Sequence, residues 1–504
     1  MPIQSIADAT TPLLLPEALR QLESVHAADG LMERAGAAAC EVALRLRADD
    51  ARPVLVVAGP GNNGGDAAVV ARLLATRGIG VTLSVIGDAA NRPADAAAAF
   101  ARLDGSGVLV REGVPENACV GLIIDGLFGI GLTRSLTGKF AEAIAAVSSI
   151  VSRNAAPVLA LDCPSGLNAA SGEQTGPAVP ASVTIAFIAA KPGLYTADGP
   201  DLCGEIQIDT LGIPSAEIEA LADGRLNELD ALDAVLSPRP KNSHKGDFGS
   251  LGILGGAPGM TGAAILAGRA ALKIGCGRVF VGLRDERIAF DPYQPELMLR
   301  NPSGLAKAPL EALVCGPGLG TDKIADALLI DILQSPLPLV LDADALTLIG
   351  ADGLAAARLR TRHPFTVITP HPGEAARMLK VPVREIGRDR VAAACELASE
   401  FNVWVALKGC GTVIASSSGA WWINTSGNPL LASAGTGDVL AGLVGAFLAQ
   451  KHAPGTALRA AVHLHGAAAD SLHARGMGMG VAAGELIDEI RSVAAAHLAT
   501  RASA

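Results

Sequence analysis

The sequence predicts an α/β protein of two domains, each built around a largely parallel sheet. The chain has 504 residues, more than the ~250–300 residues that one hydrophobic core usually organises. Apolar residues make up 50% of it, aromatic residues only 3%, and glycine is frequent. Throughout both halves, apolar strands alternate with helical segments and end in glycine or polar loops, which is the pattern of βαβ units.

Charge and cysteine content narrow the class of protein further. A net charge of -10 gives no basic excess to neutralise phosphates, which argues against general binding of nucleic acid or anionic membranes. The eight cysteines form no CxxC pair, so neither a disulfide framework nor a zinc site is expected. The N-terminal segment has no basic stretch before a long apolar run, and no apolar run crosses a bilayer uninterrupted. We expect a cytoplasmic protein.

The first half opens with helical spacing and continues as a βαβ unit. Because the strands of such a unit are parallel, the loop after the first strand lies at the carboxyl edge of the sheet, where α/β folds bind ligands. The predicted elements are a helical region from residue 13, a second helix at 31–47, a strand at 53–58, a loop at 59–66, a helix at 67–77 and a strand at 81–86.

The loop at 59–66 reads GPGNNGGD and is not a GxGxxG fingerprint. Its four glycines let the backbone approach a phosphate, while Asn62, Asn63 and Asp66 add amide groups and a carboxylate. A simple turn is the alternative. The rarity of two asparagines followed by Gly-Gly-Asp favours a binding site.

Two further strands of this half end in an acid. The strand at 121–125 ends at Asp125 and leads to GLFGIGL, and the strand at 158–162 ends at Asp162 and leads to CPSG. One strand-end acid is usually a helix cap. Acids on three loops at one sheet edge indicate a site.

These motifs, with LMERAG and KPGLYTADGPDLCGEIQI, resemble the epimerase half of the NAD(P)HX-repair proteins. The resemblance implies a Rossmann-like three-layer αβα domain, often dimeric, that interconverts the R and S epimers of hydrated NAD(P)H. It implies potassium ligands at Asn63, Asp125 and Ser165. The implied substrate contacts are Asn62, Asn63, Gly64, Gly65, Asp66, Gly129, Ile130, Gly131, Leu132, Thr133, Arg134, Ser135 and Asp162.

Asp162 is the expected acid or base of the epimerase, because changing the configuration of a carbinolamine carbon requires a proton donor or acceptor. The sequence departs from the family at Asp66-Ala67-Ala68, where a glycine commonly follows the acid. The region before Leu31, which would supply a lid and dimer contacts, is also short.

The domain boundary is expected near residue 225. Gly212-Ile213-Pro214 closes the first pattern, a mixed charged segment follows, and Pro238-Arg239-Pro240 breaks any helix. We therefore predict domains at 1–225 and 226–504.

In the second domain, strand after strand again ends in a glycine or polar loop. This arrangement predicts a second α/β domain with its site along one edge. The strands at 249–254, 312–315, 337–341, 366–369 and 403–407 end in the loops 255–264, 316–320, 342–345, 370–374 and 408–412.

The series closes at 428–446, NPLLASAGTGDVLAGLVGA. The loop before an apolar helix delivers unpaired N–H groups and the positive end of the helix dipole to one point, which is an anion site. Asp438 would be repelled by a phosphate unless it takes a proton from an attacking hydroxyl or holds a metal. An ordinary N-cap is the alternative.

Seven motifs of this domain resemble those of ribokinase-like folds and, among them, the NAD(P)HX dehydratases. They are SHKGDFG, GGAPGMTGAA, CGPGLG, DADAL, TPHPGE, KGCGT and AGTGDVLAG. The resemblance implies a ribokinase-like domain that uses Mg²⁺ and ADP to dehydrate the S epimer, with Asp438 deprotonating the 6-hydroxyl for attack on the terminal phosphate. The implied nucleotide contacts are Lys408, Gly409, Cys410, Gly411, Thr412 and Gly437, and the implied contacts to the hydrated nicotinamide are Ala264, Gly318, His371 and Asp438.

Several polar residues leave alternatives. The position of His371 between two prolines favours a site residue over a core histidine. Lys408 after an apolar strand favours a phosphate or ribose contact, because a buried lysine needs an anionic partner. The spacing of His463 and His465 is not that of an HExxH motif, which favours packing or surface positions over a metal site. Glu374 is either an acid at a helix N-terminus or a magnesium contact.

The sequence thus favours a bifunctional repair enzyme, expected to be a homo-oligomer, with NADHX or NADPHX and ADP as substrates. The enzymatic alternative is a ribokinase-like vitamin-precursor kinase fused to a binding domain, and the non-enzymatic one makes the N-terminal domain a scaffold. Intact strand-end acids count against a scaffold. ADP and ATP both remain open as the phosphate donor.

Overall fold

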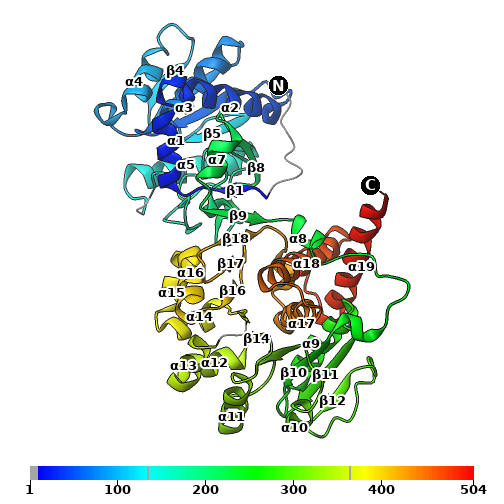
Figure 1. Ribbon diagram of the computed structural model, residues 1–504. Coiled ribbons are helices and arrows are strands. Elements are labelled where there is room, and N and C mark those ends of the chain that lie inside the picture. Colours follow the sequence, from blue (N-terminus) through cyan, green and yellow to red (C-terminus); the bar gives the residue numbers. More distant parts are fainter. Residues whose placement is uncertain (1–9, 133–134, 363–364, 504) are drawn as a thin grey trace. The chain divides into compact units, whose positions relative to one another are not determined.

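The structure is a computed structural model that describes residues 10–132, 135–362 and 365–503. The chain divides into two compact units, one of Thr11–Arg225 and one that runs from Leu226 onward. Figure 1 shows the elements of both, and each unit is described by itself. In the described ranges, no helix has the length and apolarity needed to span a bilayer.

A seven-stranded, entirely parallel sheet forms the centre of the N-terminal unit, in the order β4-β3-β2-β5-β6-β7-β8. The chain moves outward from β2 through β3 to β4 and then returns to the other side of β2. The switch point therefore lies between β2 and β5, where such sheets form a binding crevice. The strands are β2 (Val54–Ala58), β3 (Val81–Val85), β4 (Leu109–Glu112), β5 (Leu122–Gly126), β6 (Val158–Leu161), β7 (Val183–Phe187) and β8 (Glu205–Asp209).

Helices cover both faces of this sheet, which confirms the predicted three-layer αβα fold. Val54 and Val56 of β2 face one core, shared with α1, α2, α3, α4 and α7. Leu55 and Val57 face the opposite core, shared with α5. The helices are α1 (Pro16–Val25), α2 (Leu31–Arg47), α3 (Asn62–Thr76), α4 (Ala94–Ala101), α5 (Lys139–Asn154), α6 (Gly199–Cys203) and α7 (Ser215–Ala220), and β1 (Pro12–Leu13) pairs with the start of β9 (Gly224–Asn227).

In the C-terminal unit, strands follow the order β18-β17-β16-β15-β14-β13-β10-β11-β12. All neighbours from β16 to β12 are parallel, and the β17–β18 hairpin is antiparallel. The strands are β10 (Ser250–Gly255), β11 (Arg278–Leu283), β12 (Met298–Arg300), β13 (Ala312–Cys315), β14 (Leu339–Leu341), β15 (Thr366–Ile368), β16 (Trp404–Leu407), β17 (Val413–Ala415) and β18 (Trp421–Asn424).

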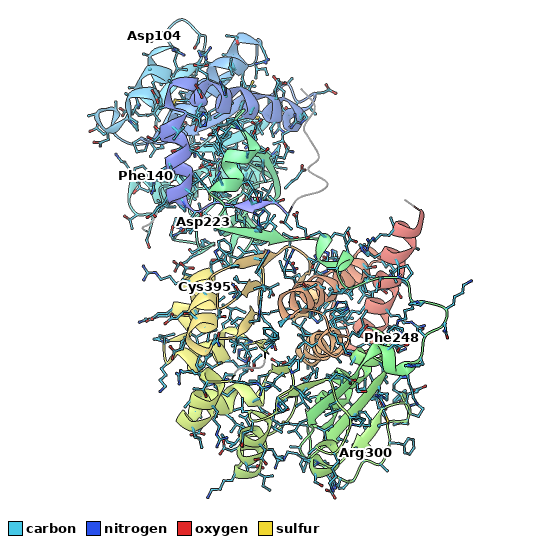
Figure 2. The ribbon with its side chains drawn as sticks, in the orientation of Figure 1. Asp104, Phe140, Asp223, Phe248, Arg300 and Cys395 are labelled. Atoms are coloured by element: carbon cyan, nitrogen blue, oxygen red, sulfur yellow. The ribbon has the colours of Figure 1, made fainter. Side chains whose placement is uncertain are left out.

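A large core lies between this sheet and the helices α9, α17, α18 and α19, and side chains fill the layers of each unit (Figure 2). α17 and α9 cross closely, since a β-carbon on Gly442 would lie 2.1 Å from the Ala267 carbonyl oxygen. The helices of this unit are α8 (Asp230–Asp233), α9 (Thr261–Lys273), α10 (Pro302–Leu305), α11 (Lys323–Ile332), α12 (Asp344–Ala351), α13 (Gly353–Arg360), α14 (Pro372–Leu379), α15 (Val383–Arg388), α16 (Arg390–Phe401), α17 (Thr436–Ala449), α18 (Pro454–Ala474) and α19 (Ala483–Ser503).

One predicted boundary is wrong. The helix expected from Ala67 begins at Asn62, so that Asn62 to Asp66 belong to α3 rather than to a loop. The glycines permit close packing instead of a long turn. A β-carbon on Gly64 would lie 2.0 Å from the Gly59 carbonyl oxygen, and one on Gly65 would lie 2.6 Å from the Met32 side chain.

Candidate active sites

A cavity of about 720 Å³ lies at the β2/β5 switch point of the N-terminal unit. The segment before α3, the loop after β5 and the end of β6 meet at its wall, and α1 and α2 complete it. Of the predicted substrate contacts, the cavity brings together Asn62, Asn63, Asp66, Gly129, Ile130, Gly131 and Asp162.

The other predicted contacts lie elsewhere or outside the described residues. Gly64 and Gly65 are buried within α3, and the Leu132 side chain is buried in the core on the α5 side. Ser135 is exposed. Thr133 and Arg134 lie outside the described residues.

Asp162 is held by several donors at the cavity wall. Its Oδ1 atom accepts a hydrogen bond from the Lys191 ammonium at 2.5 Å, and its Oδ2 atom accepts one from the Ile130 N–H at 3.2 Å. The backbone at Asp162 has a φ of 65°, a conformation that aspartate tolerates better than most residues. Gly129 must lack a side chain, because a β-carbon there would lie 2.8 Å from Asp162 Oδ2.

Lys191 is a site residue that the sequence analysis missed. It is 0% exposed, and its ammonium also donates to the Phe187 carbonyl oxygen at 2.7 Å. A buried lysine requires an anionic partner, so its position after an apolar run was the available signal. Nothing in the local sequence indicates that Asp162 is that partner.

Two further carboxyls face the same cavity. Burial raises the pKa of Asp66 well above 3.8, and the nearby charges of Asp162 and Glu23 raise it further. Burial and Asp162 likewise raise the pKa of Glu23, which comes from α1. Glu23 was also missed by sequence reasoning, because the α1 segment matched no chemical motif.

The predicted potassium ligands lie close to this cavity. Ser165 donates to Asp125 through its hydroxyl at 2.6 Å and its backbone N–H at 2.8 Å. Burial raises the pKa of Asp125, and the Ser165 hydrogen bonds oppose that rise. Asn63 donates to the Leu161 carbonyl oxygen at 3.1 Å, but its own buried amide oxygen has no partner among the described residues. The Asn63 backbone lies close to the residue after Asp125, since a β-carbon on Gly126 would lie 3.0 Å from the Asn63 carbonyl oxygen. An unsatisfied buried oxygen in a region that also holds a buried carboxyl fits a bound cation.

In the C-terminal unit, polar groups gather at the carboxyl ends of adjacent strands. Asp342 after β14 is 1% exposed, and its Oδ1 atom lies 2.7 Å from the Lys408 ammonium after β16. The next residue, Ala343, has a φ of 52°, an uncommon conformation for alanine that is often found at functional sites. Asp344 accepts a hydrogen bond from the Gly320 N–H at 2.7 Å, which ties the β13 and β14 loops together.

The sequence analysis assigned the buried charge of Lys408 to a phosphate or ribose. In the structure, Asp342 already pairs with it. The first turn of α17 lies beside this pair, since a β-carbon on Gly437 would lie 3.5 Å from the Lys408 ammonium nitrogen and 3.9 Å from Asp342 Oδ2.

Asp438 is the third residue of α17 and is not its N-cap, which is Gly435 with a φ of 86°. No described residue donates a hydrogen bond to the Asp438 side chain. Burial raises its pKa to about 6, with Asp342 raising it further and Lys408 opposing the rise. Asp438 is therefore a partly buried acid whose charge is not used for capping, next to free N–H groups at a helix start.

His371 and Glu374 form a capping box at the start of α14. His371 Nδ1 accepts from the Gly373 N–H at 3.0 Å, and Glu374 accepts from the His371 N–H at 2.8 Å. This is the helix-terminal role that the sequence left open for Glu374. Burial raises the pKa of Glu374 to about 7, whereas burial and Lys408 lower the pKa of His371.

The remaining predicted contacts lie on the strand-end loops or in the helix that follows one of them. Gly318 has a φ of 58°, and Ala264 is fully buried in α9. In the Lys408–Thr412 loop, Gly409 packs so that a β-carbon would lie 2.7 Å from the Arg390 guanidinium. Cys410 is exposed. The glycines therefore let this loop follow Arg390 closely.

The residues also fit a magnesium ion that arrives with phosphate. No group of three or more His, Cys, Asp or Glu side chains in the described ranges could hold a metal alone. Mg²⁺ usually binds one or two carboxylates together with phosphate oxygens and water, and Asp342 and Asp438 lie at the helix start that would receive a phosphate. His463 and His465 are buried in α18, as the packing interpretation expects.

Both units are similar to known protein families. A family model described as NAD(P)H-hydrate dehydratase matches residues 251–492, and one described as YjeF-related protein N-terminus matches residues 28–193. The chain is 36% identical over 487 residues to the bifunctional NAD(P)H-hydrate repair enzyme Nnr of Coxiella burnetii, covering 94% of this chain and 97% of that protein. It is 39% identical over 473 residues to the enzyme of the same name from Escherichia coli, covering 92% and 89%.

Among solved structures, an ADP/ATP-dependent NAD(P)H-hydrate dehydratase from Bacillus subtilis, crystallised with ATP and Mg²⁺, is 33% identical. It covers 54% of this chain and 98% of its own, with a TM-score of 0.49. The two Nnr proteins match this chain at more than 30% identity over nearly its whole length, and these matches decide its family. The chain belongs to the family of bifunctional NAD(P)H-hydrate repair enzymes.

Proposed function

We propose that this protein repairs hydrated NAD(P)H in two steps. Residues 1–225 interconvert the R and S epimers, and residues 226–504 dehydrate the S epimer while ADP is converted to AMP and phosphate. The observation that carries the proposal is Asp438, an acid with a pKa of about 6 that no described residue pairs with, beside Lys408 at the start of α17. The activities thus belong to the isomerase and lyase classes.

In the dehydratase site, α17 and Lys408 bind the phosphate that is transferred. The N–H groups at the start of α17 and the Lys408 ammonium offer positive charge at one point. Asp438 accepts the proton of the 6-hydroxyl as the hydroxyl oxygen attacks the terminal phosphate. Because its pKa is about 6, Asp438 is mostly ionised at pH 7 and able to act as a base.

Phosphorylation turns a poor leaving group into a good one. Phosphate departs with the electron pair of the C6–O bond, and loss of a neighbouring proton restores the ring double bond of NAD(P)H. Mg²⁺ held by Asp342 together with phosphate oxygens and water would neutralise phosphate charge. The loop Lys408–Thr412 and Gly437 hold the nucleotide, and Ala264, Gly318 and His371 hold the hydrated nicotinamide.

In the epimerase site, the cavity excludes bulk water from the carbinolamine and Asp162 transfers a proton. A potassium ion held by Asn63, Asp125 and Ser165 would fix the loop after β5 next to the substrate. Asn63 supports this because its buried amide oxygen otherwise lacks a partner among the described residues. A cytoplasmic homo-oligomer is the expected form of the enzyme.

A coupled assay tests the proposal. The protein is incubated with an R/S mixture of hydrated NADH and either ADP or ATP, and absorbance of NADH and free phosphate are followed together. The proposal expects one phosphate for each NADH regained. A stable phosphorylated product without free phosphate would instead identify a small-molecule kinase.

A further inference from the structure

The wall of the N-terminal cavity carries five carboxyl side chains among its described lining residues, more than one proton transfer requires. They come from four parts of the unit: α1, α2, the region of α3 and α4, and the end of β6. They are Glu23, Glu33, Asp66, Asp95 and Asp162.

Three of these carboxyls are ion-paired, hydrogen-bonded or exposed, which makes them poor candidates for a proton donor. Glu33 forms ion pairs with Arg72 at 2.7 Å and with Arg102 at 2.6 Å. Asp95 is exposed at the start of α4. Asp162 accepts hydrogen bonds from the Lys191 ammonium and the Ile130 N–H.

The two remaining carboxyls are Asp66 and Glu23. Asp66 is only 9% exposed and lies on the cavity wall in rigid α3. No described residue donates a hydrogen bond to its carboxyl group. Glu23 lies on α1 with its surface partly open to solvent.

Epimerisation of a carbinolamine needs a donor and an acceptor at the same time. A donor protonates the 6-hydroxyl, which leaves as water with the C6–O electron pair, while the ring nitrogen lone pair forms a C=N bond. A water molecule then adds to the opposite face of C6 and gives its extra proton to an acceptor. One proton is donated and one accepted, and the reverse reaction exchanges the two roles.

We propose that Asp66 is the proton donor of this reaction and Asp162 the acceptor, an assignment that rests on the proposed epimerase function. Lys191 cannot be the donor, since it is fully buried and its ammonium contacts Asp162 and Phe187. Asp66 meets the donor's requirements because it is enclosed, faces the cavity and forms no ion pair with any described residue.

The electrostatics around Asp66 agree with this assignment. The charged groups that face it are the carboxylates of Glu23 on α1 and Asp162 after β6, and both raise its pKa. Lys191, a cation that lines the same cavity, is bonded to Asp162. The two carboxyls thus lie in different surroundings, Asp162 paired with a cation and Asp66 beside two carboxylates, and such a difference is the usual basis for separate acid and base roles.

The test uses the full-length protein and purified S epimer without nucleotide, and follows the appearance of the R epimer by chromatography. Asp66→Asn should lower the enzymatic rate about 10²- to 10⁴-fold, the usual contribution of a positioned acid or base. The wild-type rate should fall as pH rises through the pKa of Asp66, and this limb should be absent from the variant. Asp104→Asn, at an exposed aspartate of the same unit (Figure 2), is the matched control.

Further measurements separate the outcomes. Asn has the shape of a protonated Asp, so Asp66→Asn should unfold at the same temperature as the wild type or higher, and Asp66→Glu should recover part of the rate and the alkaline limb. A normal epimerisation rate in Asp66→Asn, or a larger loss in Glu23→Gln, overturns the assignment. If the wild-type protein itself does not exceed the spontaneous rate, the epimerase function fails, while ADP-dependent dehydration of the S epimer still reports on the other domain.

Discussion

Replacing Asp438 by Asn is the sharpest test of the dehydratase site. The change keeps the size of the side chain and removes only its ability to accept a proton. Because the start of α17 is capped by Gly435 and not by Asp438, the helix should keep its first turn. Binding of the nucleotide should also survive, since Lys408 and the helix N–H groups are unchanged.

The structure gives the size and the pH dependence of the expected effect. Loss of a general base costs about 10²- to 10⁴-fold, or about 3–5 kcal/mol of transition-state stabilisation. With a pKa of about 6, Asp438 is roughly 90% ionised at pH 7 and roughly 10% ionised at pH 5. The wild-type rate should therefore fall about tenfold between these pH values, and the residual rate of the variant should lack this limb.

Stability distinguishes a lost base from a lost fold. The folded pKa of Asp438 lies above its value of 3.8 in the unfolded chain, so the folded state binds the proton more tightly. The stability that this carboxyl adds to the folded state is fully present below pH 3.8 and is lost as pH rises through about 6. Asp438→Asn should thus be at least as stable as the wild type at pH 7, by up to about 3 kcal/mol, measured by denaturant unfolding.

The assay follows NADH absorbance with purified S epimer and ADP, so that the epimerase domain is not needed. Glu385→Gln, at an exposed acid of the same unit, serves as the control and should keep the full rate. Full dehydration by Asp438→Asn, or a wild-type rate that stays flat between pH 7 and pH 5, would refute the assignment of the base.

Three other changes test neighbouring residues. Asp162→Ala should leave ADP-dependent dehydration of the S epimer intact but slow consumption of an R/S mixture, followed by absorbance, to the spontaneous rate; unchanged consumption would contradict the epimerase assignment. Lys191→Met should destabilise the N-terminal unit by about 3–5 kcal/mol, because it leaves a mostly buried carboxylate without its cation, and an unshifted calorimetric transition would show that the ion pair is not needed. Gly437→Ala should keep the fold but raise the KM for ADP at least tenfold, since its methyl group would lie 3.5 Å from the Lys408 ammonium nitrogen where a phosphate would bind; an unchanged KM would place the phosphate elsewhere.

The strand-end loops could be predicted from sequence because their signals are local. An apolar run followed by glycine and an acid marks both the strand and the edge at which it ends, and parallel strands bring such ends together. For this reason Asp125, Asp162 and Lys408 could be singled out without any knowledge of the sheet order, and Asp438 could be singled out from the glycine loop before its apolar helix.

Partners distant in the chain could not be predicted in the same way. Lys191 lies 29 residues from Asp162, and Lys408 lies 66 residues from Asp342. Their pairing depends on which strands are neighbours in the sheet, and no local pattern specifies that order. The early start of α3 was missed for a similar reason, because packing against Gly59 and Met32 overrides the weak helix propensity of its glycines.

The two units arrange charge in a similar way, although their sheets differ. In each, a strand-end acid is paired with a buried lysine: Asp162 with Lys191 and Asp342 with Lys408. In each, a second acid near the start of a helix has no such partner in the part of the chain that the structure describes, and its pKa is raised mainly by burial and then by the first acid. The lysine satisfies one carboxylate, and that carboxylate keeps the proton affinity of the second high. The second acid, Asp66 or Asp438, is therefore the member of each pair whose pKa is raised, and its Asn variant should remove the pH dependence of its own reaction while leaving that of the other domain unchanged.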